Sequence, residues 1–189
     1  MAAMLTPHPD LACSDESVLV LIDCQERLWK VIHDAASLEA RLGTLLRGAR
    51  AIGVPLIVTE QNPAGLGATL QSLTEAAGDC PRLAKSTFSC GGEPTFNEAL
   101  RATERGTVVL AGVEAHICVL QTALDLLARG FKVHVASECV GSRNPLHREA
   151  GLARLRDAGA VLTLTESLFF EWMGSTQHPA FRTIRDLVK

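Results

Sequence analysis

The sequence lacks any apolar run long enough to cross a lipid bilayer. Its longest apolar stretches, such as residues 18–22 and 108–112, are far shorter than a membrane-spanning helix requires. Residues 1–16 contain neither a basic cluster nor a long apolar stretch, so we expect no signal peptide. Basic residues are also in deficit, because 18 Lys and Arg stand against 21 Asp and Glu, a net charge of −3. Nucleic acid and anionic membranes bind basic surfaces, so we expect neither as the main partner.

The cysteines lack the paired spacing that a zinc site uses. The chain contains six of them but no CxxC, which argues against a metal site and indicates reduced thiols in a cytoplasmic protein. Several phosphate-binding and catalytic motifs are missing as well, namely GxGxxG after the first strand, GxxxxGK[ST], HExxH and GxSxG. We therefore expect no metal and no cofactor, and a serine hydrolase of the α/β type is disfavoured.

Short apolar runs alternate with helical patterns along the whole chain. With 189 residues, of which 47% are hydrophobic and 21% charged, the chain suits one compact domain. Continuous apolar strands separated by helices predict an α/β fold with a doubly wound, mainly parallel sheet covered by helices on both faces. We expect residues 1–16 to form a flexible extension and residues 17–189 a single domain. The expected strands are 18–23, 55–60, 82–86, 107–112, 132–138 and 161–165, and the expected helices are 38–52, 95–104, 117–129, 145–158, 168–173 and 181–188.

Three reactive side chains fall at the ends of expected strands. Asp23 follows the first strand, Lys85 follows the third, and Cys118 lies at the start of the helix after the fourth. Ligands bind beyond the carboxyl ends of strands in such sheets, so these residues should converge. A helix start and a nearby lysine both favour a thiolate, and Asp23 could carry the proton. Each residue also has a plainer role, as a packing thiol, a turn residue or a surface charge.

Several longer segments carry a resemblance to a known family. They are LIDCQERL (21–28), VTEQNPAGLGAT (58–69), AKSTFSC (84–90), GVEAHICVLQTALDLLARGFKV (112–133), the Ser-Arg pair at 142–143, and a closing TES…HPAF…K. On these segments the chain resembles the isochorismatase-like cysteine hydrolases, in the branch of isochorismatase domain-containing proteins. The resemblance implies a Rossmann-like three-layer fold with a parallel six-stranded sheet. It also implies a catalytic triad of Asp23, Lys85 and Cys118.

The resemblance implies further features around the cysteine. A cis peptide is expected between Val113 and Glu114, and the backbone N–H groups of Ile117 and Cys118 are expected to form an oxyanion hole. Metal-binding nicotinamidases of this superfamily carry histidines after the second strand. Here that region reads TEQNPAGLG, which supports no metal and makes nicotinamide a doubtful substrate. The presence of Cys118 favours covalent hydrolysis over the vinyl-ether chemistry of isochorismatase proper.

Five residues are candidates for the substrate pocket, and most have a structural alternative. An aromatic ring could stack on a planar substrate or pack in the core, and we favour packing for the tryptophan. The histidine next to the cysteine segment could line the pocket or cap the helix. At the end of the second strand, Glu60 is expected to pair with Arg143 in a structural role. The pocket candidates are Gln25, Trp29, Gln61, Phe88 and His116.

The hypothesis that follows is a cysteine hydrolase that cleaves an amide-like C–N bond of a small molecule through a thioester-type intermediate. Two alternatives stay open. The chain could be a catalytically silent, oligomeric binding or scaffold protein of the same fold, or its thiol could sense redox state. Relatives of the family commonly self-associate, so we expect a homo-oligomer, dimer or larger. Residues 168–173 are either a contact surface for this association or part of the core.

Overall fold

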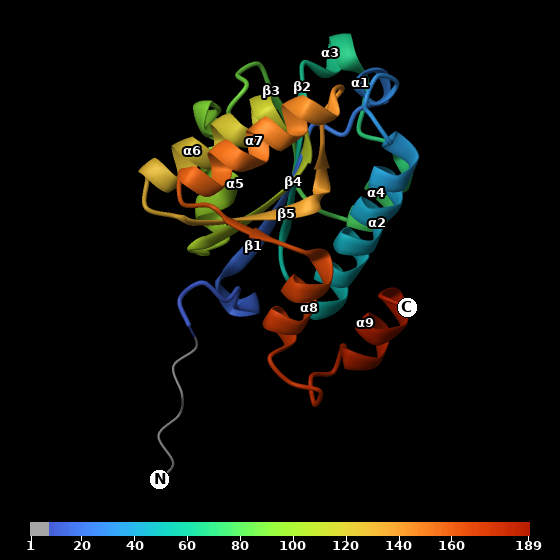
Figure 1. The fold of residues 1–189 in the computed structure, drawn as a ribbon, viewed down its shortest axis with the longest axis vertical. Coiled ribbons are helices and arrows are strands. Elements are labelled where there is room, and N and C mark those ends of the chain that lie inside the picture. The colour runs from blue at the N-terminus through green and yellow to red at the C-terminus, as the bar shows by residue number, and fades with distance from the viewer. Residues whose placement is uncertain (1–7) are drawn as a thin grey trace.

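The sheet is parallel throughout and doubly wound. The structure is a computed structural model that describes residues 8–189 of the chain. Six strands pair in the order β3-β2-β1-β4-β5-β6, and every neighbouring pair is parallel (Figure 1). The strand order reverses between β1 and β4, which confirms the predicted sheet and places its switch point there. The strands are β1 (Ser17–Ile22), β2 (Leu56–Gln61), β3 (Arg82–Lys85), β4 (Thr107–Val113), β5 (Lys132–Gly141) and β6 (Val161–Thr163).

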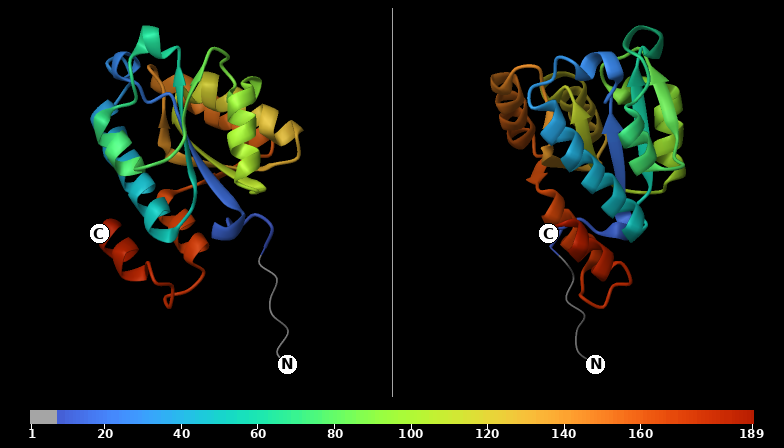
Figure 2. Two further views of the ribbon diagram at one scale, coloured as in Figure 1. Left: turned by 180° about the vertical axis from the view of Figure 1, so that it is seen from behind. Right: turned by 90° about the vertical axis from the view of Figure 1, so that its right-hand side faces the viewer.

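Helices connect the strands and cover both faces of the sheet, as Figure 2 shows. The short helices before and after β2 were not expected from the sequence, and two of them have only four residues, about one turn, which is too few to show a helical hydrophobic pattern. None of the described helices is both long and apolar enough to span a membrane. The helices are α1 (Glu26–Trp29), α2 (Ala35–Ile52), α3 (Pro63–Leu66), α4 (Gln71–Ala77), α5 (Pro94–Ala102), α6 (Leu120–Ala128), α7 (Pro145–Asp157), α8 (Thr165–Met173) and α9 (Phe181–Leu187), with the short 3-10 helices η1 (Ser14–Glu16) and η2 (Cys90–Gly92) and the π-helix η3 (Ala115–Val119).

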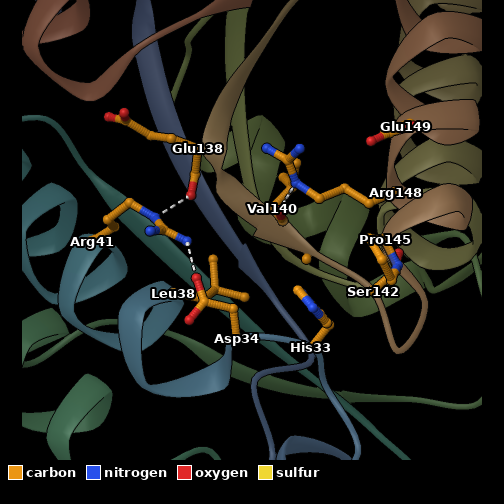
Figure 3. Close-up of a pocket in the computed structure, with 11 residues that line it drawn as sticks. His33, Asp34, Leu38, Arg41, Glu138, Val140, Ser142, Pro145, Arg148 and Glu149 are labelled. Atoms are coloured by element: carbon orange, nitrogen blue, oxygen red, sulfur yellow. Dashed lines mark hydrogen bonds and ion pairs between the residues drawn. The ribbon is translucent and has the colours of Figure 1, made fainter.

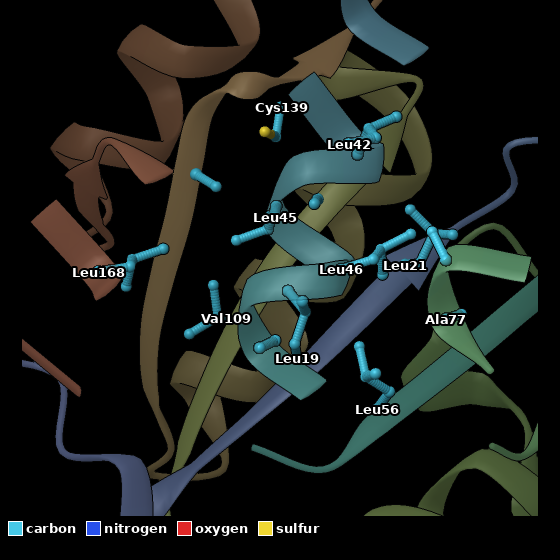
Figure 4. Close-up of a cluster of buried hydrophobic side chains, with 14 of the residues drawn as sticks. Leu19, Leu21, Leu42, Leu45, Leu46, Leu56, Ala77, Val109, Cys139 and Leu168 are labelled. Carbon is cyan, nitrogen blue, oxygen red and sulfur yellow. The ribbon is translucent and has the colours of Figure 1, made fainter. Parts of the chain in front are cut away.

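Alternate residues of β1 face two separate cores. Leu19 and Leu21 pack in the core that α2, α8 and α9 cover, part of which appears in Figure 4. Val18, Val20 and Ile22 pack on the opposite face, in the core under α5, α6 and α7. All six residues of β1 are buried. Burying one such side chain fully contributes about 1.5–3 kcal/mol, so both cores hold β1 in a fixed position.

The segment 168–173 belongs to the core and is not mainly a contact surface. Leu168, Phe169, Trp172 and Met173 of α8 are buried against α2 and the sheet, whereas Phe170 is 43% exposed. The glycine at position 48 of α2 lies so close to Phe169 that a Cβ atom there would come within 2.1 Å of the ring. Close packing of α8 on α2 therefore explains the apolar character of this segment.

Part of the N-terminal extension is packed on the domain. The backbone N–H of Ala12 donates to Glu171 Oε2 at 2.8 Å, and Ala12 is only 1% exposed. The Trp172 indole N–H donates to Ser17 Oγ at 3.1 Å, next to this segment. Residues 1–7 of the expected flexible extension lie outside the described residues. Ala12, just before η1, is therefore packed on the domain and is not part of a flexible extension as the sequence had suggested.

Candidate functional site

The ends of β1, β3 and β4 bring Asp23, Lys85 and Cys118 into one buried cluster. Asp23 directly follows β1, Lys85 is the last residue of β3, and Cys118 lies in the π-helix η3 after β4. Asp23 adopts a positive φ of 55°, and its N–H donates to the Thr59 carbonyl of β2 at 3.1 Å. Asp23 is fully buried, Lys85 is 4% exposed and Cys118 is 7% exposed. The switch point of the sheet thus gathers the three residues that the sequence singled out.

Asp23 and Lys85 form a buried ion pair. The Lys85 Nζ atom lies 2.7 Å from Asp23 Oδ2, while the Thr59 hydroxyl donates to Asp23 Oδ1 at 3.0 Å. Burial raises the pKa of Asp23 above its ordinary value, and the charge of Lys85 opposes that rise. Apart from the ion pair, Oδ2 has no hydrogen-bond donor within the part of the chain that the structure describes. The Asp23 carboxylate thus lies between the Lys85 ammonium and the Thr59 hydroxyl.

Lys85 is held as a fixed positive charge. Besides Asp23, its ammonium donates to Gln61 Oε1 at 2.6 Å and to the carbonyls of Thr87 and Phe88 at 3.2 Å each. An ammonium has three hydrogens, and four oxygens surround this one. These contacts hold the ammonium in one position, so Lys85 suits an electrostatic role.

The Cys118 thiol is protonated in the resting protein. Burial, followed by the negative charge of Asp23, raises the pKa of Cys118 to about 12, and the charge of Lys85 only partly offsets this. The expectation of a thiolate at the helix start was therefore wrong, because burial next to a carboxylate outweighs the helix end and the lysine. Hydrogen bonding between the Cys118 thiol and Asp23 affects the pKa of both groups.

The backbone before Cys118 runs close to β1. A Cβ atom on Gly112, whose φ is +117°, would lie 2.1 Å from the Ile22 carbonyl oxygen, so only glycine fits there. The peptide bond between Val113 and Glu114 is cis. The Ile117 N–H, one of the two expected oxyanion donors, already donates to the Glu114 carbonyl at 3.0 Å. Of the two, Ile117 would have to share its hydrogen with a substrate oxygen.

The pocket candidates take quite different positions. Gln25 is fully buried, and its amide pairs with the backbone of Gln61, donating to the carbonyl at 3.0 Å and accepting from the N–H at 2.7 Å. Trp29 is 8% exposed and packs in the core, as the structural alternative held. Phe88 is 57% exposed on the surface, although its carbonyl contacts Lys85. Of the five candidates, Gln61 is the one whose side chain bonds to the Asp23–Lys85 pair.

His116 joins the ends of β4 and β5. Its Nδ1 atom lies 3.1 Å from Ser142 Oγ, and its ring centroid lies 4.7 Å from that of His147, with the two rings tilted by 49°. Burial lowers the pKa of His116, so the ring is mainly neutral at neutral pH. These contacts explain its position without a substrate.

The expected pairing of Glu60 with Arg143 was wrong. Glu60 Oε1 instead accepts from the N–H and the hydroxyl of Thr69, at 2.8 and 2.7 Å. Arg143 binds the buried Glu114, with Nε 2.5 Å from Oε1. Sequence position alone does not distinguish these partners, because Glu60 and Glu114 both lie at the carboxyl ends of strands, β2 and β4.

A separate hollow of about 360 Å³ opens between α2, α7 and the end of β5 (Figure 3). Asp23, Lys85 and Cys118 do not line it. Its arginines are engaged by backbone carbonyls, since Arg41 donates to Glu138 at 2.7 Å and Arg148 to Val140 at 2.8 Å. Across the described residues, no group of three or more His, Cys, Asp or Glu side chains is arranged to hold a metal.

The sheet order and the two-faced helical cover define a three-layer α/β protein with its polar cluster at the strand switch point. The chain belongs to the isochorismatase family, a family of hydrolases, because the profile of the isochorismatase domain matches residues 17–167. This result confirms the resemblance found in the sequence.

Known relatives agree with this assignment. Isochorismatase domain-containing protein 2 of Bos taurus is 40% identical over 176 residues, which cover 92% of this chain and 83% of that protein. Its counterpart from Homo sapiens is 38% identical over 175 residues, with the same coverage of 92% and 83%. A solved structure described as the MAR1 ribonuclease of Caenorhabditis elegans superposes with a TM-score of 0.88 at 35% identity, covering 94% of this chain and 91% of that one.

Proposed function

We propose that this protein is a cysteine hydrolase that cleaves an amide-like C–N bond of a small molecule. Cys118 is the nucleophile, Asp23 is the general acid and base, and Lys85 is the fixed charge that orients Asp23. The observation that carries the proposal is the buried pair of Asp23 Oδ2 and Lys85 Nζ, 2.7 Å apart, beside the protonated thiol of Cys118. Membership of a hydrolase family supports the same reaction class.

The first step joins proton transfer to nucleophilic attack. Asp23 accepts the proton of the Cys118 thiol, and the resulting thiolate attacks the substrate carbonyl carbon. The electron pair of the carbonyl moves to its oxygen, which the backbone N–H groups of Cys118 and Ile117 stabilise. Each such donor contributes about 2.7–4 kcal/mol in other enzymes. Lys85 stabilises the negative charge while Asp23 is protonated.

The second half of the cycle releases the amine, hydrolyses the thioester and restores the Cys118 thiol. Protonated Asp23 donates its proton to the leaving nitrogen as the C–N bond breaks, which leaves a thioester on Cys118. Asp23 then takes a proton from water as the hydroxide attacks the thioester carbonyl. When the C–S bond breaks, the proton returns to sulfur and a carboxylic acid leaves. The reaction consumes one water and needs no cofactor.

The exposure of the thiol limits the size of the substrate. Only 7% of Cys118 is exposed, so a small acyl group can approach it more readily than a polymer. The Caenorhabditis elegans relative bears the name of a ribonuclease, but the charge of this chain does not favour RNA as a substrate. RNA binding is usually driven by a basic surface, whereas the net charge here is −3.

The two alternatives fit the site less well. A redox sensor requires an accessible, low-pKa thiol, whereas burial raises the pKa of Cys118 to about 12. A scaffold protein has no need of a buried Asp23–Lys85 pair, whose burial costs desolvation energy that apolar residues would avoid. The small-molecule hydrolase is therefore the better account of these residues.

We also propose that the protein acts in a reducing compartment such as the cytoplasm and that it self-associates. All six cysteines are free, which suits reducing conditions.

Large apolar side chains remain exposed at Leu146 (68%), Val31 (54%) and Phe170 (43%), and a second copy of the chain could cover them. Light scattering on purified protein over a concentration series would measure the oligomer directly, and a monomer at every concentration would refute self-association.

A substrate panel tests the proposed reaction. Small aliphatic and aromatic amides, carbamates and hydroxamates are incubated with wild type, with Cys118→Ala and with Asp23→Asn. Cys13→Ala is the matched control, because Cys13 is exposed and lies outside the site. We expect both site variants to abolish turnover of any substrate and the control to retain it. Turnover retained by Cys118→Ala would exclude the covalent route.

A further inference from the structure

Gln61 joins the buried ion pair to the backbone around it. Its backbone is fixed at the end of β2 by the amide of Gln25, through bonds of 2.7 and 3.0 Å. Its side-chain Nε2 donates to the Ser86 carbonyl at 2.8 Å, and its Oε1 accepts from Lys85 Nζ at 2.6 Å. Because the Ser86 carbonyl can only accept, the amide of Gln61 must present its oxygen to Lys85.

A neutral side chain at this position keeps the buried cluster electrically balanced. Ionised Asp23 and protonated Lys85 sum to zero, and the protonated thiol of Cys118 adds no charge. A carboxylate in place of the Gln61 amide would give a net negative cluster, and each negative charge opposes formation of a thiolate. The amide oxygen supplies a hydrogen-bond acceptor for Lys85 without that charge.

We propose that Gln61 is a positioning residue that aims the Lys85 ammonium at Asp23 and sets the charge available to stabilise the Cys118 thiolate. This inference rests on the proposed function, since it assigns Gln61 a part in generating the nucleophile. Gln61 itself does not touch the reacting sulfur in this account. It acts through Lys85. The sequence had predicted a different role for Gln61, in the substrate pocket.

Other titratable groups lie around the loops that contact Lys85, and their charges also act on the site. Burial raises the pKa of Cys90 to about 11, so this neighbouring thiol stays neutral. Backbone donors lower the pKa of Glu93 to about 2, so it stays ionised while bonded to the loop that contacts Lys85. Glu60 accepts from Thr69. The titratable groups whose charges interact with Lys85 are therefore Asp23 after β1, Cys90 of η2 and Cys118 of η3, whereas Glu60 and Glu93 are engaged by Thr69 and by Ser86.

Alkylation of Cys118 by iodoacetamide measures the proposed effect without a known substrate. The rate at Cys118 is read by peptide mass spectrometry between pH 7 and pH 10 in wild type, Gln61→Glu and Gln61→Met. The exposed Gln177, outside the cluster, gives the matched control Gln177→Glu. Thermal unfolding of each variant verifies that the fold is retained.

The two Gln61 variants should differ in their effect on alkylation of Cys118. Gln61→Glu should slow alkylation about tenfold, which corresponds to a rise of roughly one unit in the pKa of Cys118. Gln61→Met removes one hydrogen-bond acceptor of the Lys85 ammonium and adds no charge. The ammonium can then stabilise the Cys118 thiolate as well as before or better, so alkylation should be unchanged or up to about threefold faster. Gln177→Glu should match wild type.

The outcomes separate this inference from the proposed function. Equal slowing in both Gln61 variants would indicate a merely structural role, and a wild-type rate in Gln61→Glu would show that the residue does not set the charge. Either result overturns the inference while leaving Cys118 as the nucleophile. If Cys118→Ala still hydrolyses an amide that wild type hydrolyses, the proposed function itself fails, whatever the Gln61 variants show.

Discussion

Removing one partner of the Asp23–Lys85 pair should destabilise the protein strongly. Both side chains are almost fully buried, with 2% of the lysine side chain and none of the aspartate side chain exposed. Lys85→Met leaves the Asp23 carboxylate buried without its counter-charge, and Asp23→Asn leaves the ammonium in the same position. Breaking a buried pair in this way costs about 3–5 kcal/mol of unfolding free energy. Urea denaturation followed by circular dichroism at pH 8 measures the loss.

The double variant Asp23→Asn with Lys85→Met provides the control for this prediction. With both charges removed, no unpaired ion remains buried, so the double variant should recover most of the loss of either single variant. The penalty of Lys85→Met should also shrink at low pH. Burial already raises the pKa of Asp23, and loss of Lys85 raises it further, so the carboxylate becomes protonated and neutral as the pH falls through this raised value.

The refuting result is a small effect in the single variant. A loss below about 1 kcal/mol in Lys85→Met would be typical of a solvated surface pair and would contradict the buried geometry. A penalty that grew as the pH fell from 8 to 4 would have the wrong sign for a carboxylate whose folded-state pKa is raised. Either outcome would remove the electrostatic basis of the proposed site.

Three further predictions concern packing and the loop beside the site. Phe169→Ala should cost about 3–5 kcal/mol in urea denaturation, because the ring is fully buried. The matched Phe170→Ala, 43% exposed, should cost much less, and equal losses would contradict the assignment of α8 to the core. Gly112→Ala should sharply reduce soluble, folded protein, because a Cβ there would lie 2.1 Å from a β1 carbonyl, and wild-type thermal stability would refute this contact. Ionised Glu93 binds the Ser86 N–H, so exchange protection of that amide should be full above the ordinary pKa of 4.5 and be lost as pH falls through about 2, whereas protection independent of pH would exclude this bond.

The strand ends were predictable from the sequence because hydrophobic runs mark strands well. Once the fold was assigned as doubly wound, the carboxyl ends of β1, β3 and β4 had to lie on one edge, and Asp23, Lys85 and Cys118 followed. Helices of about one turn carry too little periodicity to be found, and α1 and α3 were missed for this reason.

Burial and side-chain partners were beyond sequence reasoning. The thiol of Cys118 was expected to ionise at a helix start, yet its pKa depends on burial and on the distance to Asp23, which no local pattern encodes. The roles of Gln25 and Gln61 are similar cases. Both amides were predicted to line a substrate pocket. The structure shows instead that Gln25 fixes the backbone of β2 and that Gln61 contacts Lys85.

Acylation by p-nitrophenyl acetate tests the central claim, that Cys118 attacks carbonyl carbon with Asp23 as its base, most directly. Wild type and Asp23→Asn are treated briefly at neutral pH, and the acetylated cysteines are identified and timed by peptide mass spectrometry. Cys118 in wild type should be acetylated faster than Cys13, although Cys13 is exposed and Cys118 is buried. Asp23→Asn should lose this advantage. Acetylation of Cys13 at an equal or higher rate in wild type would contradict the account.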